Sequence, residues 1–236
     1  MAGGPTVRHQ PDDPETAAAR QDWFRHYASG PTRTRWTELP PQAGDRVPDL
    51  ELVEARSGRP TRLSTRWAAG PAILLFWRHY GCSCGRDRAK RLAEELPAYL
   101  AAGASVAIVG QGELERTRVY AAANAIPDEV AIFCDPDELA YRAFGILEAG
   151  PIEIFFDAPD EYLRCDQEAG RAIAAARADA GMPLVDNTWL MPAEFVVDRG
   201  GTFRYVYRYQ FCENWPDPRV LVAAARFSTG DLAVGR

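Results

Sequence analysis

An uninterrupted apolar run at Ala72–Trp77 limits the possible folds of this chain more than any other segment. Apolar side chains at consecutive positions, without alternation, are typical of a central strand that is buried on both faces of a sheet. A short loop containing Gly81 follows, and apolar residues then recur every three or four positions over Ala89–Leu100, the pattern of one helix face. Pro97 lies inside that pattern and should kink the helix. The sequence therefore predicts a buried strand that leads through a short loop into a helix.

Two more strand and helix pairs follow along the chain. Ser105–Gly110 is a second apolar run that precedes a helical segment at about 114–124, and a third run at 129–135 precedes a short helical segment at 136–146. Strands that alternate with helices in this way form a parallel sheet with right-handed crossover connections. We expect the core to open with the segment 44–52, which precedes all three pairs.

The C-terminal part of the chain predicts a hairpin and a last helix. Ala193–Asp198 is apolar and is followed by a tight turn at 199–201, a strand at 202–211 and a helical segment at 218–227. Aromatic residues occupy every second position of the second hairpin strand: Phe203, Tyr205, Tyr207, Tyr209 and Phe211. Alternation with a period of two predicts a strand with one aromatic face. The expected fold class is α/β, with a central mixed sheet flanked by helices.

The length of 236 residues fits one core domain with added segments. We assign 44–236 to this domain and 1–43 to an N-terminal extension with one predicted helix at about 14–27. Residues from about 149 to 190 interrupt the strand and helix alternation, and an alanine-rich stretch at about 159–180 predicts a helical insertion there.

Composition and charge exclude several kinds of partner. The formal net charge is -6, whereas binding of nucleic acid phosphates needs clustered excess cations. No apolar run approaches the roughly 20 residues that span a bilayer, and the N-terminus lacks the apolar core of a signal peptide. We therefore expect a cytoplasmic protein with no nucleic acid and no membrane partner, and its alanine- and arginine-rich composition is typical of high-GC bacteria.

Cys82 is the leading candidate for a reactive group. It lies where the Ala72–Trp77 strand gives way to a helix, and unpaired backbone N–H groups and the helix dipole stabilise an anion at a helix N-terminus. Nearby cationic or ionisable side chains are Arg78, His79, Arg86 and Arg88. Together these features should lower the thiol pKa from its usual value of about 8.5, and the thiolate is the reactive form. The alternative is that Cys82 is only a small loop residue.

The other four cysteines differ in their expected roles. Cys84 either forms a disulfide with Cys82 or points into the helix without pairing. Cys212 follows the aromatic strand and is a candidate resolving thiol, whereas Cys134 ends a core strand and should be an inert buried residue. Cys165 has no evident partner. Cys82 and Cys84 with His79 would suit a soft metal, but no distant ligand set presents itself, so we predict no metal and no cofactor.

Four segments resemble landmarks of the peroxiredoxin-like (AhpC/TSA-type) proteins of the thioredoxin-fold superfamily. These segments are GDRVPDLEL, LFWRHYGCSCGRDRAKRL, DPDELAYRAFGI and FVVDRGGTFRY. They occur in the family's order, and the resemblance covers residues 44–148 and 190–227. It implies a thioredoxin-like fold and thiol-dependent catalysis, with Cys82 at the position of the peroxidatic cysteine.

The chain also departs from that family's pattern. His79 and Leu75 occupy the positions of the family's Thr or Ser and Pro, and Gly85 stands where the second Cys of a CxxC motif would be. Pro192 occupies the position of the family's Arg and resembles the cis-proline that faces the active-site cysteine of thioredoxins. The resemblance therefore implies supporting roles for Pro192 and for the cationic groups near Cys82, with altered chemistry at the site.

We weigh three functions. The first is a thiol-disulfide or peroxide-reducing oxidoreductase in which Cys82 attacks the substrate and Cys84 or an external thiol resolves the product. The second is a non-redox cis/trans isomerase in which the Cys82 thiolate adds reversibly to a conjugated acyl chain, which a carrier protein could present. The third is a non-catalytic binding module. Expected partners are a small-molecule or acyl-chain substrate, a thiol reductant protein and a second copy in a homodimer.

The aromatic residues offer a tentative substrate pocket. Trp77, Tyr80, Trp189 and Tyr205 could line an apolar cleft beside Cys82, although aromatic stripes more often belong to a core. Arg78 either orients an anionic substrate or forms a surface salt bridge.

Overall fold

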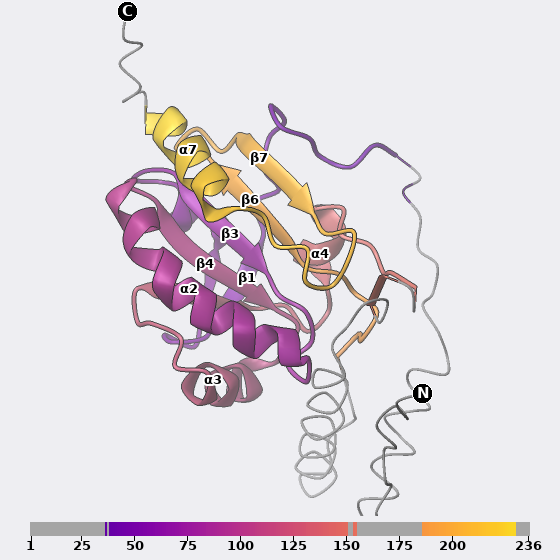
Figure 1. The fold of residues 1–236 in the computed structure, drawn as a ribbon. Helices are drawn as coiled ribbons and strands as arrows, with labels where there is room; N and C mark the ends of the chain where they lie inside the picture. The colour runs from indigo at the N-terminus through magenta and orange to yellow at the C-terminus, as the bar shows by residue number, and fades with distance from the viewer. Residues whose placement is uncertain (1–35, 37, 151–152, 155–185, 230–236) are drawn as a thin grey trace, which may run out of the picture.

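A computed structural model describes residues 36, 38–150, 153–154 and 186–229, and these form one sheet with helices on its two faces (Figure 1). The strands are β1 (Glu51–Glu54), β2 (Arg59–Arg62), β3 (Ala72–Phe76), β4 (Ser105–Gly110), β5 (Val130–Cys134), β6 (Ala193–Val197) and β7 (Phe203–Arg208). The helices are the short 3-10 helix η1 (Leu63–Arg66), α2 (Ser83–Ala101), α3 (Leu114–Ala123), α4 (Leu139–Ala143) and α7 (Pro218–Thr229).

The sheet is mixed, as the sequence predicts. In the described part of the chain its strand order is β2-β1-β5-β4-β3-β6-β7. The three apolar runs β3, β4 and β5 pair in parallel at the centre, whereas β1 and β6 join them antiparallel and the hairpins β1–β2 and β6–β7 form the edges. A parallel centre with a C-terminal hairpin and helix is the expected thioredoxin-like α/β arrangement, which is confirmed.

The core divides into two clusters because alternate strand residues face opposite sides of the sheet. In β5, Val130 and Ile132 pack toward α2 and α7 in what we call the α2-side cluster. Ala131 and Phe133 point the other way, into the cluster that includes Ala140 and Tyr141 of α4, which we call the α4-side cluster. Burial on both faces of the sheet thus explains the continuous apolar sequence. Each fully buried large side chain contributes roughly 1.5–3 kcal/mol to the free energy of folding.

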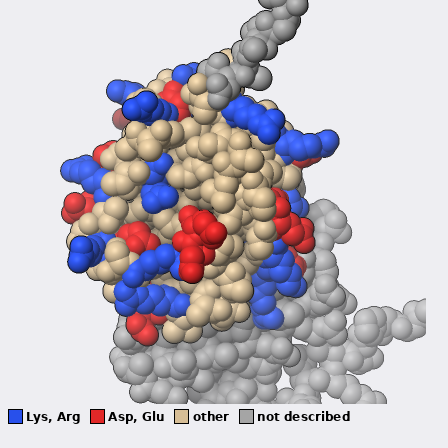
Figure 2. All heavy atoms as spheres, turned by 90° about the vertical axis from the view of Figure 1, so that its left-hand side faces the viewer, with Lys and Arg blue, Asp and Glu red and all other residues tan. Residues whose placement is uncertain are grey.

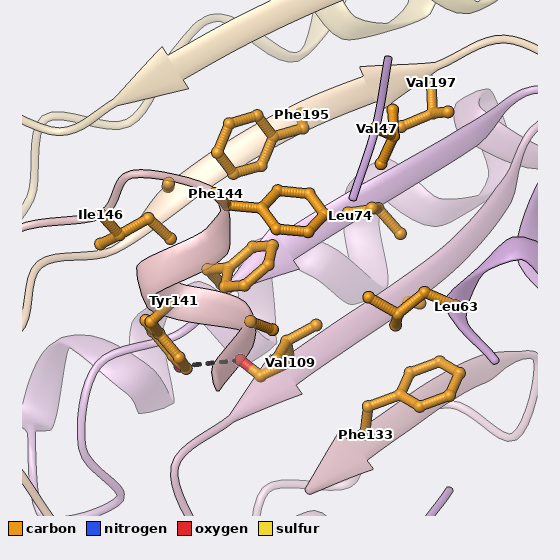
Figure 3. Packing of buried hydrophobic residues seen from close by; sticks show 14 of the residues in the cluster. Val47, Leu63, Leu74, Val109, Phe133, Tyr141, Phe144, Ile146, Phe195 and Val197 are labelled. Atoms are coloured by element: carbon orange, nitrogen blue, oxygen red, sulfur yellow. Dashed lines mark hydrogen bonds between the residues drawn. The ribbon is translucent and has the colours of Figure 1, made fainter. Parts of the chain in front are cut away.

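Several aromatic side chains pack against one another in the α4-side cluster (Figure 3). Phe144 packs edge-on against Phe195 and Phe203, with ring centroids 5.1 and 5.5 Å apart. The hydroxyl of Tyr141 donates a hydrogen bond of 2.9 Å to the carbonyl oxygen of Val109, which satisfies its one buried polar atom. These contacts fix α4 against the centre of the sheet.

The prediction of one aromatic face on the last strand is wrong. A β-bulge interrupts the β6–β7 ladder, so that Val197 pairs with Phe203 while Val196 pairs with Tyr205. Phe203 therefore packs in the α4-side cluster, whereas Tyr205 packs against the α2-side cluster. The extra residue of a bulge shifts the alternation by one position, which a period-two pattern does not reveal.

The two added segments are only partly described. The predicted helices at 14–27 and 159–180 lie outside the described residues. Of the extension, Trp36 donates a hydrogen bond of 2.9 Å from Nε1 to the carbonyl oxygen of Gly145. The two ends of the insertion meet in an antiparallel bridge between Glu148 and Leu190.

The described helices include none with the length and apolar character needed to cross a membrane. On the face drawn in Figure 2, basic and acidic side chains are interspersed around uncharged residues. The described part of this face therefore carries both signs of charge.

Candidate active site

The candidate site begins at the junction between β3 and α2, as the sequence predicts. Cys82 is the N-cap residue of α2, with extended backbone angles. Its N–H donates a hydrogen bond of 3.0 Å to the carbonyl oxygen of His79, and its own carbonyl accepts one of 3.1 Å from Gly85 N–H. Cys82 thus lies at the positive end of a helix of 19 residues, where an anion is stabilised.

Cys82 and Cys84 are joined by a disulfide. Their Cα atoms are 5.3 Å apart, across one intervening residue. Of the two arrangements that the sequence leaves open for Cys84, the structure has the paired one. Both sulfurs are buried, because Cys82 is 4% and Cys84 5% exposed.

A third sulfur completes the site. Cys212, in the segment that follows β7, is 3% exposed, and its Sγ lies 3.9 Å from Cys82 Sγ. The Sγ atoms of Cys82, Cys84 and Cys212 all lie within 4.8 Å of one another. Reduced thiolates in this arrangement would be donors for a soft metal, whereas two of the three are bonded to each other here.

Arg78 connects two of these sulfurs. Its Nη1 donates to Cys212 Sγ at 2.9 Å and lies 3.6 Å from Cys82 Sγ, while its Nη2 donates to the carbonyl oxygen of Thr188. Arg78 is 4% exposed, so the alternative of a surface salt bridge is wrong. Burial raises the pKa of Cys212 to about 11, even though the Arg78 guanidinium acts to lower it.

The other predicted cationic groups lie in different surroundings. His79 is buried and contributes its carbonyl oxygen to the turn before α2. Arg86 is exposed on the surface of α2. Arg88 is buried, but it forms ion pairs of 2.9 Å with Glu95 and 3.0 Å with Glu194. Among the predicted cationic residues that the structure describes, Arg78 is therefore the one that contacts the sulfurs of Cys82 and Cys212.

A small cavity opens beside the disulfide. It offers about 20 Å³ to a water-sized molecule, against the roughly 10–15 Å³ that one water needs. Its lining includes Cys84, Cys212, Arg88, Glu194, Tyr209 and Trp215. Tyr209 belongs to the aromatic stripe of the last strand, whereas sequence reasoning missed Glu194 and Trp215. Of these two residues, Glu194 is recognisable in the sequence, because it is the one charged residue in an apolar strand.

The tentative aromatic pocket is largely wrong. Trp77 lines the cavity, as expected. Tyr80 instead turns toward α3, where its ring stacks on Tyr120 at a centroid distance of 4.1 Å. Trp189 belongs to the α4-side cluster, and Tyr205 packs against the α2-side cluster, so neither lines the cavity.

Two further expectations have clear outcomes. Pro192 lines the cavity with Cys84, but the peptide bonds of the described residues are all trans, so the expected cis-proline is wrong. Cys134 is buried at the end of β5, and burial raises its pKa, as expected of an inert thiol. Cys165 lies outside the described residues.

The sheet order and the disulfide at the start of α2 together define a thioredoxin-fold protein of the peroxiredoxin-like class. Comparison with known families agrees, because residues 43–206 match the AhpC/TSA family. The match covers more than half of the chain, and the protein belongs to the AhpC/TSA family.

Individual relatives are distant. The chain is 27% identical over 99 residues to the chloroplastic thioredoxin-like protein AAED1 of Arabidopsis thaliana, a match that spans 42% of this chain and 39% of that relative's length. Solved structures resemble it over more of its length. They include peroxidoxin BcpB from Mycobacterium tuberculosis (18% identity, 79% of this chain and 97% of that one, TM-score 0.52). A peroxiredoxin-like protein from Aquifex aeolicus is also similar in structure (12% identity, 80% of this chain and 89% of that one, TM-score 0.55). At such identities the likeness shows the fold.

Proposed function

We propose that the protein is a thiol-dependent oxidoreductase that reduces a peroxide or a disulfide, with Cys82 as nucleophile and Cys84 as its partner. The observation that carries the proposal is the Cys82–Cys84 disulfide at the start of α2, which is the oxidised product that such a cycle forms. The family, and the description of one structural neighbour as a thiol peroxidase from Chromobacterium violaceum, support the same class of reaction.

The reaction needs a reduced Cys82 that is held as a thiolate. The helix N-terminus and the Arg78 guanidinium, 3.6 Å from the sulfur, favour the negative charge. The thiolate attacks one peroxide oxygen, the O–O bond breaks, and Cys82 becomes a sulfenic acid while water or an alcohol leaves. The Cys84 thiol then attacks the Cys82 sulfur, which forms the disulfide and releases water.

The size of the cavity favours a small oxidant. Its volume of about 20 Å³ corresponds to between one and two water molecules, which suits hydrogen peroxide or the end of a larger hydroperoxide. Both Cys84 and Cys212 line it, so an oxidant or an attacking thiolate placed there lies beside the sulfur cluster. A thiol reductant, small or protein-borne, would restore the two free thiols.

The test is peroxide turnover by the full chain with dithiothreitol as reductant. Cys82→Ser should lose turnover entirely. The double variant Cys84→Ser with Cys212→Ser, reduced and then freed of dithiothreitol, should still consume one equivalent of peroxide and then accumulate a sulfenic acid that a dimedone probe traps. Cys134→Ser is the matched control, because Cys134 is a buried thiol outside the sulfur cluster. A Cys82→Ser variant that turns over at the full rate would contradict the proposal.

The same assay separates redox from non-redox chemistry. An oxidoreductase consumes one dithiol per peroxide, and its turnover stops when the reductant is exhausted. Turnover of an acyl substrate with no reductant consumed would instead indicate isomerisation at Cys82.

A further inference from the structure

We propose that Cys212 is a third redox thiol, and that the Cys82 sulfur forms either of two disulfides, one with Cys84 and one with Cys212. The inference rests on the proposed redox role of Cys82 and extends it, because it adds a partner from the far end of the chain.

The distances support two partners for one sulfur. Cys212 Sγ lies 3.9 Å from Cys82 Sγ, in contact, although the two residues are 130 positions apart in the chain. All three sulfurs are buried in one cluster with 3–5% exposure. Cys134 offers a comparison within the same protein, since it is also a buried free thiol but packs in the α2-side cluster.

The exchange step is internally balanced. Cys212 loses its proton to water in the cavity, its thiolate attacks Cys82 Sγ, and the Cys82–Cys212 bond forms as the Cys82–Cys84 bond breaks. The electron pair leaves with Cys84 Sγ, which then takes a proton from water. No external oxidant or reductant takes part, because one disulfide and one thiol are present before and after. Thiol-disulfide exchange needs the attacking, central and leaving sulfurs in line. The three Sγ atoms form a triangle with every pair within 4.8 Å, so one side chain must rotate for the exchange to occur.

Arg78 is the positioning residue for this exchange. Its Nη1 is within 2.9 Å of Cys212 Sγ and 3.6 Å of Cys82 Sγ, so its charge favours a thiolate on either sulfur. Its other end is held by the carbonyl oxygen of Thr188. The leaving Cys84 thiolate lies in the first turn of α2, where the helix dipole stabilises it. Each sulfur of the cluster thus has a group that stabilises its anionic form.

The test removes Cys84 and asks what Cys82 pairs with. The full chain carries Cys84→Ser together with Cys134→Ser and Cys165→Ser, which leaves Cys82 and Cys212 as its two cysteines. It is equilibrated in buffers of reduced and oxidised glutathione, quenched with acid, alkylated, digested without reductant and analysed by mass spectrometry. We expect a peptide pair linked through Cys82 and Cys212 to be the main oxidised product. Adding Cys212→Ser leaves Cys82 as the single cysteine, so the internal link is lost completely and a mixed disulfide between glutathione and Cys82 should take its place.

Two results in the chain that keeps Cys212 would overturn the inference. One is accumulation of a mixed disulfide between glutathione and Cys82 without the internal link, and the other is that both thiols stay reduced where the wild-type pair is oxidised. Cys84→Ala repeats the measurement without the added hydroxyl, so that an effect of the buried serine hydroxyl can be told apart from the loss of the Cys84 sulfur. Because glutathione is the oxidant, the result does not depend on peroxide turnover. A linked peptide pair in a protein without peroxidase activity would reject the proposed function and keep this inference.

Discussion

A buried ion network beside the site permits a quantitative test of how α2 is held to the sheet. Arg88, on α2, donates from Nε to Glu194 Oε1 of β6 at 3.0 Å and from Nη1 to Glu95 Oε2 at 2.9 Å. Glu194 also accepts a hydrogen bond of 2.6 Å from the hydroxyl of Tyr209. Burial acts to lower the pKa of Arg88, but the two carboxylates raise it above its usual value. The network therefore holds Arg88 as a buried cation between two carboxylates.

The perturbation is Arg88→Met, which keeps most of the side-chain volume and removes the charge. Its side chain is 7% exposed, and removing one partner of a buried ion pair costs about 3–5 kcal/mol because the other charge stays buried. Glu95 keeps Arg91, which contacts its Oε1 at 3.0 Å, so the loss falls mainly on Glu194. We therefore expect a cost near the lower end, about 3 kcal/mol of unfolding free energy.

Arg91→Met is the matched control. Arg91 is also on α2 and also pairs with Glu95, but its side chain is 35% exposed, so its loss should cost about 1 kcal/mol or less. Urea unfolding of the oxidised proteins, followed by circular dichroism, gives both values from the midpoint at unchanged slope. Equal losses for the two variants would refute the reasoning. The double variant Arg88→Met with Glu194→Gln should recover part of the loss, since it removes the unpaired charge.

Three more predictions follow from the site and its supports. Arg78→Met should slow the reaction of reduced Cys82 with peroxide by about 10- to 100-fold in stopped-flow, because a charge-assisted hydrogen bond is worth about 1.5–3 kcal/mol, and an unchanged rate would exclude a role for the cation. Burial raises the pKa of Cys212 from an ordinary 9.0 to about 11, so the folded state favours the neutral thiol. The contribution of this preference to the unfolding free energy is complete below pH 9 and is lost as the pH rises to 11. The unfolding free energy of the oxidised wild type should therefore fall by up to about 3 kcal/mol more than that of Cys212→Ser over this range, and parallel curves would contradict the shift. A Cβ added at Gly110 would lie 2.1 Å from the hydroxyl oxygen of Tyr80, so Gly110→Ala should cost about 1–3 kcal/mol and change the near-ultraviolet circular dichroism, and a wild-type spectrum would show that the ring adjusts freely.

The central strands and the start of α2 were predictable because burial on both faces leaves an unbroken apolar run. The run Ala72–Trp77 forms β3 one residue shorter, and Ser105–Gly110 forms β4 with the predicted bounds. The position of Cys82 at the helix start follows from the same logic, since a strand that ends at a short loop must turn into the next helix there. Local pattern alone was sufficient for these features.

Contacts between distant segments were not predictable from pattern. The burial of Arg78 against Cys212 depends on where the segment after β7 returns, and an arginine in a loop is usually solvated. The aromatic alternation from Phe203 suggested one face, but the bulge moves Tyr205 to the other side of the sheet. Tyr80 satisfies its hydroxyl on Thr117 of α3, 37 residues away, and so turns from the cavity. In each case the partner comes from a part of the chain that local periodicity does not connect.

The register of the sheet explains why the third sulfur lies where it does. Phe76, the last residue of β3, pairs with Ala193 of β6, and Ala193 pairs with Arg208 at the end of β7. The chain therefore leaves β7 at the level where β3 ends and α2 begins, and four residues later it places Cys212 against Cys82. The bulge takes up one residue of β7, and without it every later residue of β7 would shift along β6 by about 3.3 Å. A shift of that size is comparable with the 3.9 Å contact between the two sulfurs, so the irregularity that breaks the aromatic face also sets the register that brings Cys212 to Cys82.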